Sequence, residues 1–229
     1  MRKGNLSVQE IWHSIYPVTG YDEEQKHPAK RGCGVAESHI TKKALAQALK
    51  EMMQTTAFAK ISVGDICERC GMNRKSFYYH FKDKYDLVNW IYETEFIEQV
   101  RPNDFHSIWD FLSKLCTYFY ANRRFYANAL SVRGQNSFSD YFDELLHPVI
   151  AAYLMDLFSA EEEQACVDFY ADAIRISIQR WLASGLELEG PTFVERIRHI
   201  LITTAQRLLQ EEERADHGFA PSADCGITT

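Results

Sequence analysis

The stretch SVGDICERCGMNRKSFYYHF, residues 62–81, contains the signals for two short helices separated by a tight turn. Ser62 and Asp65 stand three residues apart, the spacing at which two side chains cap the first turn of a helix. Four apolar residues then recur at helical spacing and form one face: Val63, Ile66, Cys67 and Cys70. Gly71 follows, and glycine most readily adopts the left-handed conformation that ends a helix. The sequence therefore predicts a capped helix followed by a sharp turn.

A second helix is expected after Asn73, because an asparagine side chain satisfies free backbone N–H groups of a first turn. Phe77 and Phe81 lie four residues apart, so they share the inner face of this helix. The residues left on the outer face are basic or aromatic: Arg74, Lys75, Tyr78 and Tyr79. A capped helix, a glycine turn and a short helix with such a face predict a helix-turn-helix, whose second helix can enter the major groove of DNA.

The residue types around this second helix suit contacts with DNA. Arg74 and Lys75 stand in its first turn, where side chains can reach guanine O6 and N7. Ser76 and Tyr79 could add weaker contacts to a base or to a methyl group. Five further residues suit phosphate contacts, through a polar side chain or a helix start: Thr41, Ser62, Tyr78, His80 and Lys84.

Helical periodicity continues along most of the chain, and few stretches alternate as strands do, so an all-α fold is predicted. Residues 38–85 are expected to form a three-helix DNA-binding domain whose first helix begins at Thr41. Residues 86–214 are expected to form a helical domain for effector binding and dimerisation. The remaining segments, residues 1–37 and 215–229, are predicted to be flexible, because they combine charge, Gly and Pro with no periodicity.

Composition favours a globular protein of the cytoplasm. The 229 residues are 46% hydrophobic and 13% aromatic, which allows a substantial core. The six cysteines lack the dense spacing of a secreted disulfide scaffold. No apolar run approaches the roughly 20 residues that a membrane span needs, and the start, MRKGNLSVQE, lacks the apolar segment of a secretory signal. We therefore expect no membrane partner.

The net charge of −7 is unevenly distributed. Residues 38–85 hold nine Lys/Arg and four Asp/Glu, whereas residues 86–229 hold eleven and twenty-three. Salt screens charges beyond about 8 to 10 Å, so a basic patch attracts polyanions whatever the total charge of the chain. The basic segment is the one that contains the predicted helix-turn-helix, which favours double-stranded DNA as a partner.

The longer stretch ISVGDICERCGMNRKSFYYHFKDKYDLVNWIY, residues 61–92, resembles the DNA-binding signature of the TetR family of bacterial transcriptional regulators. The shared features are a glycine turn, a capped recognition helix that ends in Tyr-x-His-Phe, and a Lys-x-Lys-x-x-Leu start to the next helix. The resemblance spans about residues 40–96. It implies base contacts from Arg74, Lys75, Ser76 and Tyr79, and phosphate contacts from Ser62, Tyr78, His80 and Lys84. It also implies a non-enzymatic regulator that binds a palindromic operator as a homodimer.

The C-terminal half carries a second resemblance. The segment ANALSVRGQNSFSDYF, residues 127–142, is similar to a TetR subgroup that includes activators of dihydroxyacetone-kinase operons. The family holds an effector pocket among these helices, which makes three aromatic residues candidates for its lining: Trp109, Phe119 and Tyr126. Aromatic residues at this spacing are also typical of a core, and the effector itself could be a small molecule or a protein.

The last two expected helices, residues 161–184 and 192–212, are apolar on more than one side. One face of each can serve the core of the domain. The other needs a partner, and pairing two such hairpins in an intermolecular four-helix bundle is the economical solution. The sequence therefore predicts a homodimer.

Two features depart from the family pattern. Family members usually begin near the first helix, so residues 1–37 are additional; Lys30 and Arg31 could reach a minor groove as a basic arm, or the segment could be disordered. Ala57 stands where the subgroup often has proline. We expect this to loosen the turn between the first two helices without abolishing the fold.

A different class of function, a thiol- or metal-responsive sensor or a small helical enzyme, stays open on residues of the same region. Cys67 and Cys70 could form half of a zinc site or a thiol sensor, and His80 could be a metal ligand or a pH switch. A zinc site needs two further ligands, and no second Cys or His pair stands at the usual spacing. We interpret the two cysteines as part of an apolar helix face, and expect no metal and no cofactor.

Overall fold

The computed structural model describes residues 32–100, 105, 107–132, 134, 136–154, 160–185 and 187–218. Its α-helices in these ranges are α2 (Gly32–Met52), α3 (Val63–Arg69), α4 (Arg74–His80), α5 (Lys84–Glu95), α6 (Ile108–Ala121), α7 (Arg123–Leu130), α8 (Phe138–Leu154), α9 (Ala160–Ala183) and α10 (Gly190–Gly218). Two 3-10 helices, η1 (Phe58–Lys60) and η2 (Ile97–Gln99), lie between them. No strand occurs in these ranges, so the predicted all-α fold is confirmed. None of the helices described here is long and apolar enough to span a membrane.

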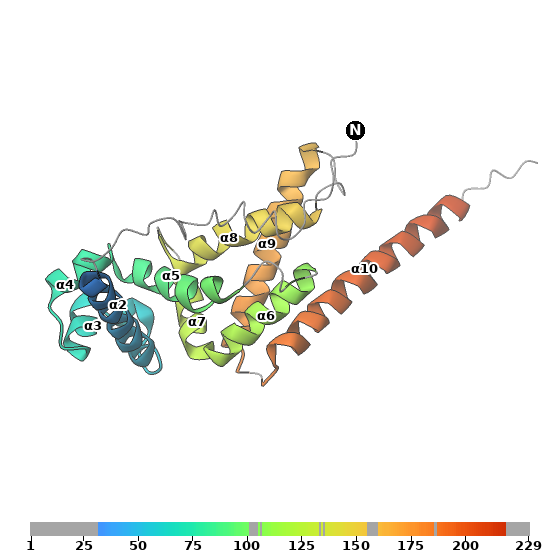
Figure 1. Ribbon diagram of the computed structural model, residues 1–229. Coiled ribbons are helices and arrows are strands. Elements are labelled where there is room, and N and C mark those ends of the chain that lie inside the picture. Colours follow the sequence, from blue (N-terminus) through green and yellow to red (C-terminus); the bar gives the residue numbers. More distant parts are fainter. Residues whose placement is uncertain are drawn as a thin grey trace, which may run out of the picture.

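The helices form two groups that α5 connects (Figure 1). Helices α2, α3 and α4 lie together at one end of the molecule. In the second group α8 packs along α9 and α6 packs along α10, while the far end of α10 extends away from the other helices (Figure 1). Helix α5 contacts both α2 and α8, so it belongs to the packing of both groups.

The predicted helix-turn-helix is present. Ser62 Oγ accepts the Asp65 N–H at 3.2 Å, and the Asp65 carboxylate accepts the Ser62 N–H at 2.8 Å, which completes the capping box of α3. Gly71 turns the chain with a φ of 68°. Asn73 Oδ1 accepts the Ser76 N–H at 2.8 Å and so caps α4. Each of these local signals acts as the sequence indicates.

The inner face of α4 holds the first group of helices together. Phe77 is fully buried and Phe81 is 3% exposed, and the Phe81 ring meets Trp90 of α5 edge-on at 5.7 Å. Leu45 and Leu49 of α2 are also fully buried. The predicted inward positions of both phenylalanines are confirmed, and they leave the opposite side of α4 to the solvent.

An aromatic cluster joins the second group to α5. Tyr92 of α5 is 1% exposed, and its ring centroid lies 5.9 Å from that of Phe119 on α6 and 5.4 Å from that of Phe138 on α8. Tyr126 of α7 completes the cluster, 4.3 Å from the Phe119 ring. The connecting helix is thus anchored by packing against three further helices.

Two helices extend beyond their predicted limits. Helix α2 begins at Gly32, so Thr41 lies inside it and not at its start. The apolar periodicity marks only the buried part of a helix, and polar residues can extend it outward. Helix α10 runs from Gly190 to Gly218, so it is longer than the predicted 192–212 and includes residues 215–218 of the predicted tail. The basic-arm residues Lys30 and Arg31 lie outside the described residues, as do residues 219–229 of the predicted tail.

The opposite faces of α4 should respond differently to truncation. Phe77→Ala is expected to lower the free energy of unfolding by about 3–5 kcal/mol, because it leaves a cavity in the packing of three helices. Tyr79→Ala is the matched control, since Tyr79 is 81% exposed, and it should change stability by no more than about 0.5 kcal/mol. Urea denaturation followed by circular dichroism measures both values; equal losses would contradict the assignment of inner and outer faces.

Candidate nucleic-acid interface

The outer face of α4 presents the residues predicted to contact bases. Arg74, Lys75 and Tyr79 are exposed, the last of them by 81%. Ser76 is half-buried, and its hydroxyl donates to Asn73 Oδ1 at 3.2 Å. The structure thus brings these side chains together on one seven-residue helix, although the hydroxyl of Ser76 is already used by the cap.

The Arg74 side chain lies against the first turn of α3. A Cβ atom at Gly64 would collide with Arg74 Nη2 and stand 3.1 Å from Arg74 Nε. Only a glycine leaves room for the guanidinium in this position. Gly64 was not among the predicted site residues, although a glycine inside a predicted helix is a signal of close approach by another group.

Asp65, in the first turn of α3, lies within reach of the charge of this guanidinium. Hydrogen bonds from the backbone and side chain of Ser62 lower the pKa of Asp65, and the positive charges of Arg74 and Lys84 lower it further. The carboxylate is therefore ionised at neutral pH and offsets part of the positive charge on the outer face. This arrangement favours one position of the Arg74 head over others.

Tyr78 and His80 lie beside the positions predicted to contact bases. Tyr78 is 58% exposed, and the Tyr79 and His80 rings meet edge-on at 4.9 Å. Partial burial and the nearby charge of Lys42 lower the pKa of His80 below its ordinary value. At neutral pH the imidazole is therefore uncharged and can donate one N–H. Lys42, on α2, is a further cation beside this face that the sequence analysis left out of the site.

The ammonium group of Lys84 bonds within the protein. It donates to the carbonyl oxygens of Phe58 at 2.8 Å, Ile61 at 2.7 Å and Ala59 at 3.4 Å, which accounts for its three N–H groups. It also lies 4.6 Å from the centroid of the Phe58 ring. Burial lowers the pKa of Lys84, while the charges of Asp65 and Asp83 oppose that shift. A phosphate contact from Lys84 stays a prediction, and here the side chain holds the connection between α2 and α3.

The two predicted contacts that relied on a helix start have different outcomes. Ser62 is exposed at the first turn of α3, where its hydroxyl accepts from Asp65 and keeps its own O–H to donate. Thr41 is half-buried in the interior of α2, so the argument from a helix start does not apply to it. Its phosphate contact stays a prediction without that support.

The cysteine pair lies on the inner side of α3. Cys67 is 3% exposed, and the half-buried Cys70 points its thiol at the Ile66 carbonyl oxygen, 3.2 Å away. Burial raises the pKa of the Cys67 thiol, which disfavours the thiolate that metal binding and redox chemistry need. Among the described residues, no group of three or more His, Cys, Asp or Glu is placed to hold a metal ion. The geometry fits packing better than a thiol or metal sensor.

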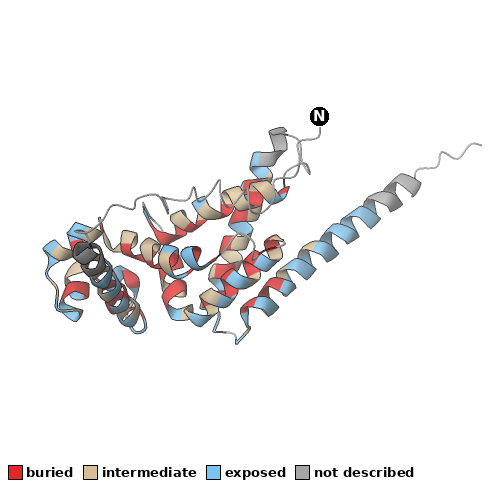
Figure 2. Cartoon of the chain, in the orientation of Figure 1, coloured by how far each residue is buried: buried red, intermediate tan, exposed pale blue. Residues whose placement is uncertain are grey.

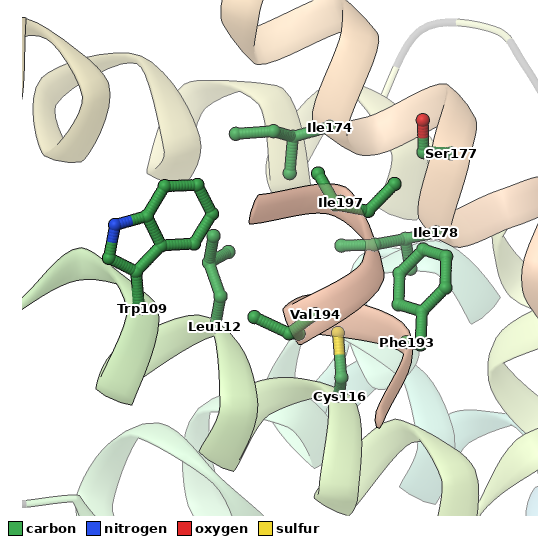
Figure 3. Close-up of a pocket in the computed structure, with 9 residues that line it drawn as sticks. All are labelled: Trp109, Leu112, Cys116, Ile174, Ser177, Ile178, Phe193, Val194 and Ile197. Atoms are coloured by element: carbon green, nitrogen blue, oxygen red, sulfur yellow. The ribbon is translucent and has the colours of Figure 1, made fainter. Parts of the chain in front are cut away.

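The three residues predicted to line an effector pocket lie in different environments. Phe119 and Tyr126 are fully buried in the aromatic cluster. Trp109, on α6, is half-buried and lines two cavities. The smaller cavity has room for about 20 Å³, little more than one water molecule. Figure 3 shows residues of α6, α9 and α10 around it, with Trp109 on one side and Phe193 on the other.

The larger cavity has a volume of about 270 Å³ and lies between α6, α8, α9 and α10. Its lining carries no charged side chain: Ile108, Trp109, Leu112, Ile150, Tyr153, Leu154, Tyr170, Ile174, Leu201, Ile202 and Ala205. Two tyrosine hydroxyls and the indole N–H are the polar side-chain groups available there. The cavity therefore suits a small apolar molecule with one or two polar groups.

The fold and the outer face of α4 define a helix-turn-helix protein, and comparison with known families agrees. The profile of the bacterial regulatory proteins of the tetR family matches residues 45–91, and that of a transcriptional regulator C-terminal region matches residues 107–203. The chain belongs to the TetR family of bacterial regulatory proteins. The resemblance drawn from residues 61–92 is thus confirmed.

Individual relatives point the same way. The chain is 33% identical, over 118 residues, to the HTH-type dhaKLM operon transcriptional activator DhaS of Lactococcus lactis, a match that spans 49% of this chain and 62% of that relative. The solved structure of a dihydroxyacetone kinase operon activator DhaS matches 72% of this chain and 96% of its own with a TM-score of 0.54 and 25% identity. NalD, the secondary repressor of the MexAB-OprM efflux pump in Pseudomonas aeruginosa, shares the fold at a TM-score of 0.55 and 14% identity, over 72% of this chain and 96% of its own.

Proposed function

We propose that this protein is a transcriptional regulator that acts in the bacterial cytoplasm, binds a palindromic DNA operator as a homodimer, and is switched by an effector in its C-terminal domain. The observation that carries the proposal is the exposed basic and aromatic face of α4, presented by a capped helix-turn-helix. Membership in the TetR family and the similarity to an operon activator support it. The proposed role is binding and signalling without catalysis.

DNA recognition is proposed to divide between bases and phosphates. The major groove is about 12 Å wide and admits one helix, so α4 can present Arg74, Lys75 and Tyr79 to base edges. The arginine fork matches guanine O6 and N7 in two parallel hydrogen bonds. Ser62, Tyr78 and His80 lie around this helix and are proposed to fix its register on the backbone.

Arg74 is expected to contribute to sequence preference. Arg74→Ala should weaken binding to a DNA duplex selected from a random library by the wild-type protein, by about 1–3 kcal/mol, and should relax the preference at one position of each half-site. Lys114→Ala removes one positive charge from the exposed surface of α6 and should leave preference and affinity close to wild type. Mobility-shift titrations measure both, and an Arg74→Ala variant with unchanged preference would contradict the base contact.

Gly64→Ala tests the position of the guanidinium without removing a charge. Alanine is a better helix former than glycine by about 1 kcal/mol, so α3 should be retained, but the added Cβ must displace Arg74. We expect the sequence preference to relax at the position that Arg74→Ala affects. A Gly64→Ala variant with wild-type sequence preference would show that recognition does not need the Arg74 side chain to lie against α3.

The homodimer is proposed from the exposed apolar face of the last helices. Ile200, Leu208 and Leu209 of α10 are 53%, 56% and 60% exposed, and Phe169 of α9 is 65% exposed. The exposed part of α10 points away from the other helices of the protein (Figure 2). A second copy that covers this face would remove the apolar surface from water, and self-complementary pairing closes the assembly at two chains.

Leu209→Asp is expected to convert a dimer to a monomer at micromolar concentration, because it places an unpaired charge in the proposed apolar contact. Gln210→Asp adds the same charge one residue further along the exposed helix and should remain dimeric if the contact depends on the apolar face. Light scattering after gel filtration measures both masses. A Leu209→Asp variant that stays dimeric would move the interface away from this part of α10.

The proposed small-molecule effector site is the apolar cavity of about 270 Å³ between α6, α8, α9 and α10. A ligand there would contact α10, which also carries the proposed dimer face, so binding could change the separation of the two recognition helices. A protein effector remains the other form of the proposal, because the similarity to an operon activator does not distinguish the two.

Filling the cavity should abolish the response to a small-molecule effector. Compounds that raise the thermal midpoint of the wild-type protein are expected to lose this effect on Ala205→Trp, whose indole would occupy the cavity. The same compounds should change operator affinity in mobility-shift titrations. An affinity that stays the same at saturating compound would contradict the proposed switch, and a coactivator captured from the native host would favour the protein effector.

A further inference from the structure

The connector between α2 and α3, residues 53–61, is held by side chains from outside the helix-turn-helix. Asn128 of α7 uses both ends of its amide on it. Its Oδ1 accepts the Phe58 N–H at 2.8 Å, and its Nδ2 donates to the carbonyl oxygens of Thr56 at 2.9 Å and Met53 at 3.4 Å. One side chain thus satisfies three backbone groups of a segment that has little regular structure of its own.

These hydrogen bonds are specific to an asparagine. Aspartate would keep the acceptor for the Phe58 N–H and lose both donors, and alanine would lose all three groups. Phe58 is 1% exposed, so its N–H has little water available as a replacement partner. An unsatisfied buried backbone group costs more than a hydrogen bond contributes when it is formed, which makes the Asn128 contact one that the connector depends on.

The opposite end of α7 is fastened to the end of α9. Arg123 Nε donates to the Leu182 carbonyl oxygen at 2.9 Å, and Arg123 Nη2 donates to that of Trp181 at 3.2 Å. The Trp181 ring stacks on Phe193, in the first turn of α10, with ring centroids 4.5 Å apart. Helix α7 therefore runs from the corner between α9 and α10 to the connector.

An open cleft lies beside the contact between the connector and α7. The cleft has a volume of about 600 Å³, and its lining includes Arg123, Arg124 and Asn128 on one side and residues 53–57 on the other. Beside this cleft α7 is linked to the connector by the hydrogen bonds of Asn128 and by a longer one, from Arg124 Nη1 to the Gln54 carbonyl oxygen at 3.5 Å. Such a link can shift its position more readily than an interdigitated core can.

Two attachments, one from α5 and one from α7, fix an orientation that a single attachment would leave free to rotate. Helix α5 is attached to the connector through Lys84, whose ammonium group donates hydrogen bonds to the carbonyl oxygens of Phe58, Ala59 and Ile61. Asn128, in the C-terminal domain, is hydrogen-bonded to the same connector. We infer that Asn128 is a positioning residue that sets the orientation of the helix-turn-helix relative to the C-terminal domain and transmits changes at the α9–α10 corner to α4. This inference rests on the proposed DNA-binding function.

The orientation of each helix-turn-helix fixes the separation of the two half-sites that a dimer can bind. Loss of Asn128 should therefore broaden the tolerance for spacing, which a loss of stability alone would not do. The probe is a duplex selected from a random library by the full-length wild-type protein, together with versions that have one base pair added or removed at the centre.

For the wild-type protein, each change of spacing is expected to weaken binding by about tenfold. For Asn128→Ala the loss of affinity should be less than about threefold, because the helix-turn-helix can change its orientation to fit the altered spacing. Asn128→Asp should lie between wild type and Asn128→Ala. Asn122→Ala is the matched control: its amide donates to the Tyr118 carbonyl oxygen at 3.1 Å within the C-terminal domain, so spacing dependence should stay that of wild type. An Asn128→Ala variant as sensitive to spacing as wild type would overturn the inference.

Hydrogen exchange tests the contact without DNA. The Phe58 amide should exchange about tenfold faster in Asn128→Ala than in wild type, and at an unchanged rate in Asn122→Ala. If the wild-type protein selects no duplex, the proposed DNA-binding function fails, while faster exchange at Phe58 still supports the attachment. Unchanged exchange at Phe58 would overturn the attachment itself. If Asn128→Ala does not fold, Asn128→Leu supplies both measurements, because leucine is close to asparagine in size and has neither the acceptor nor the donors.

Discussion

The burial of Phe77 and Phe81 is the contact on which the rest of the proposed DNA-binding surface depends. A helix of seven residues is too short to be stable in water by itself, so α4 exists because its inner face packs and its start is capped by Asn73. Once the two phenylalanines face inward, helical geometry places Arg74, Lys75 and Tyr79 outward. The polar surface is therefore a consequence of an apolar one.

Two of the attachments between the helix-turn-helix and the C-terminal domain differ in kind. The first is α5, whose Tyr92 is packed in an aromatic cluster with side chains of α6, α7 and α8. Close-packed aromatic rings resist small displacements. The second is the set of hydrogen bonds from Asn128 and Lys84 to the connector. The packed aromatic cluster gives the proposed regulator a defined orientation of its helix-turn-helix. The hydrogen bonds to the connector are a contact through which that orientation could change.

Helix α10 lies where two proposed functions meet. Leu201, Ile202 and Ala205 line the apolar cavity, whereas Leu208 and Leu209 belong to the exposed face assigned to the dimer. A molecule bound in the cavity would contact the same helix that is proposed to pair two chains. Coupling between the cavity and the proposed dimer face then requires no long pathway, because both include residues of α10.

The sequence alone determined the features that depend on neighbours within a few residues. The capping box at Ser62, the glycine turn, the Asn73 cap and the inward pair of phenylalanines follow from fixed helical spacing. Only the tertiary structure decided contacts between distant segments: Lys84 bonds Phe58 across 26 residues, and Asn128 bonds it across 70. It also placed Phe119 and Tyr126 in the core, with Trp109 beside the cavities. Periodicity tells which face is apolar, but what covers that face depends on how whole helices pack.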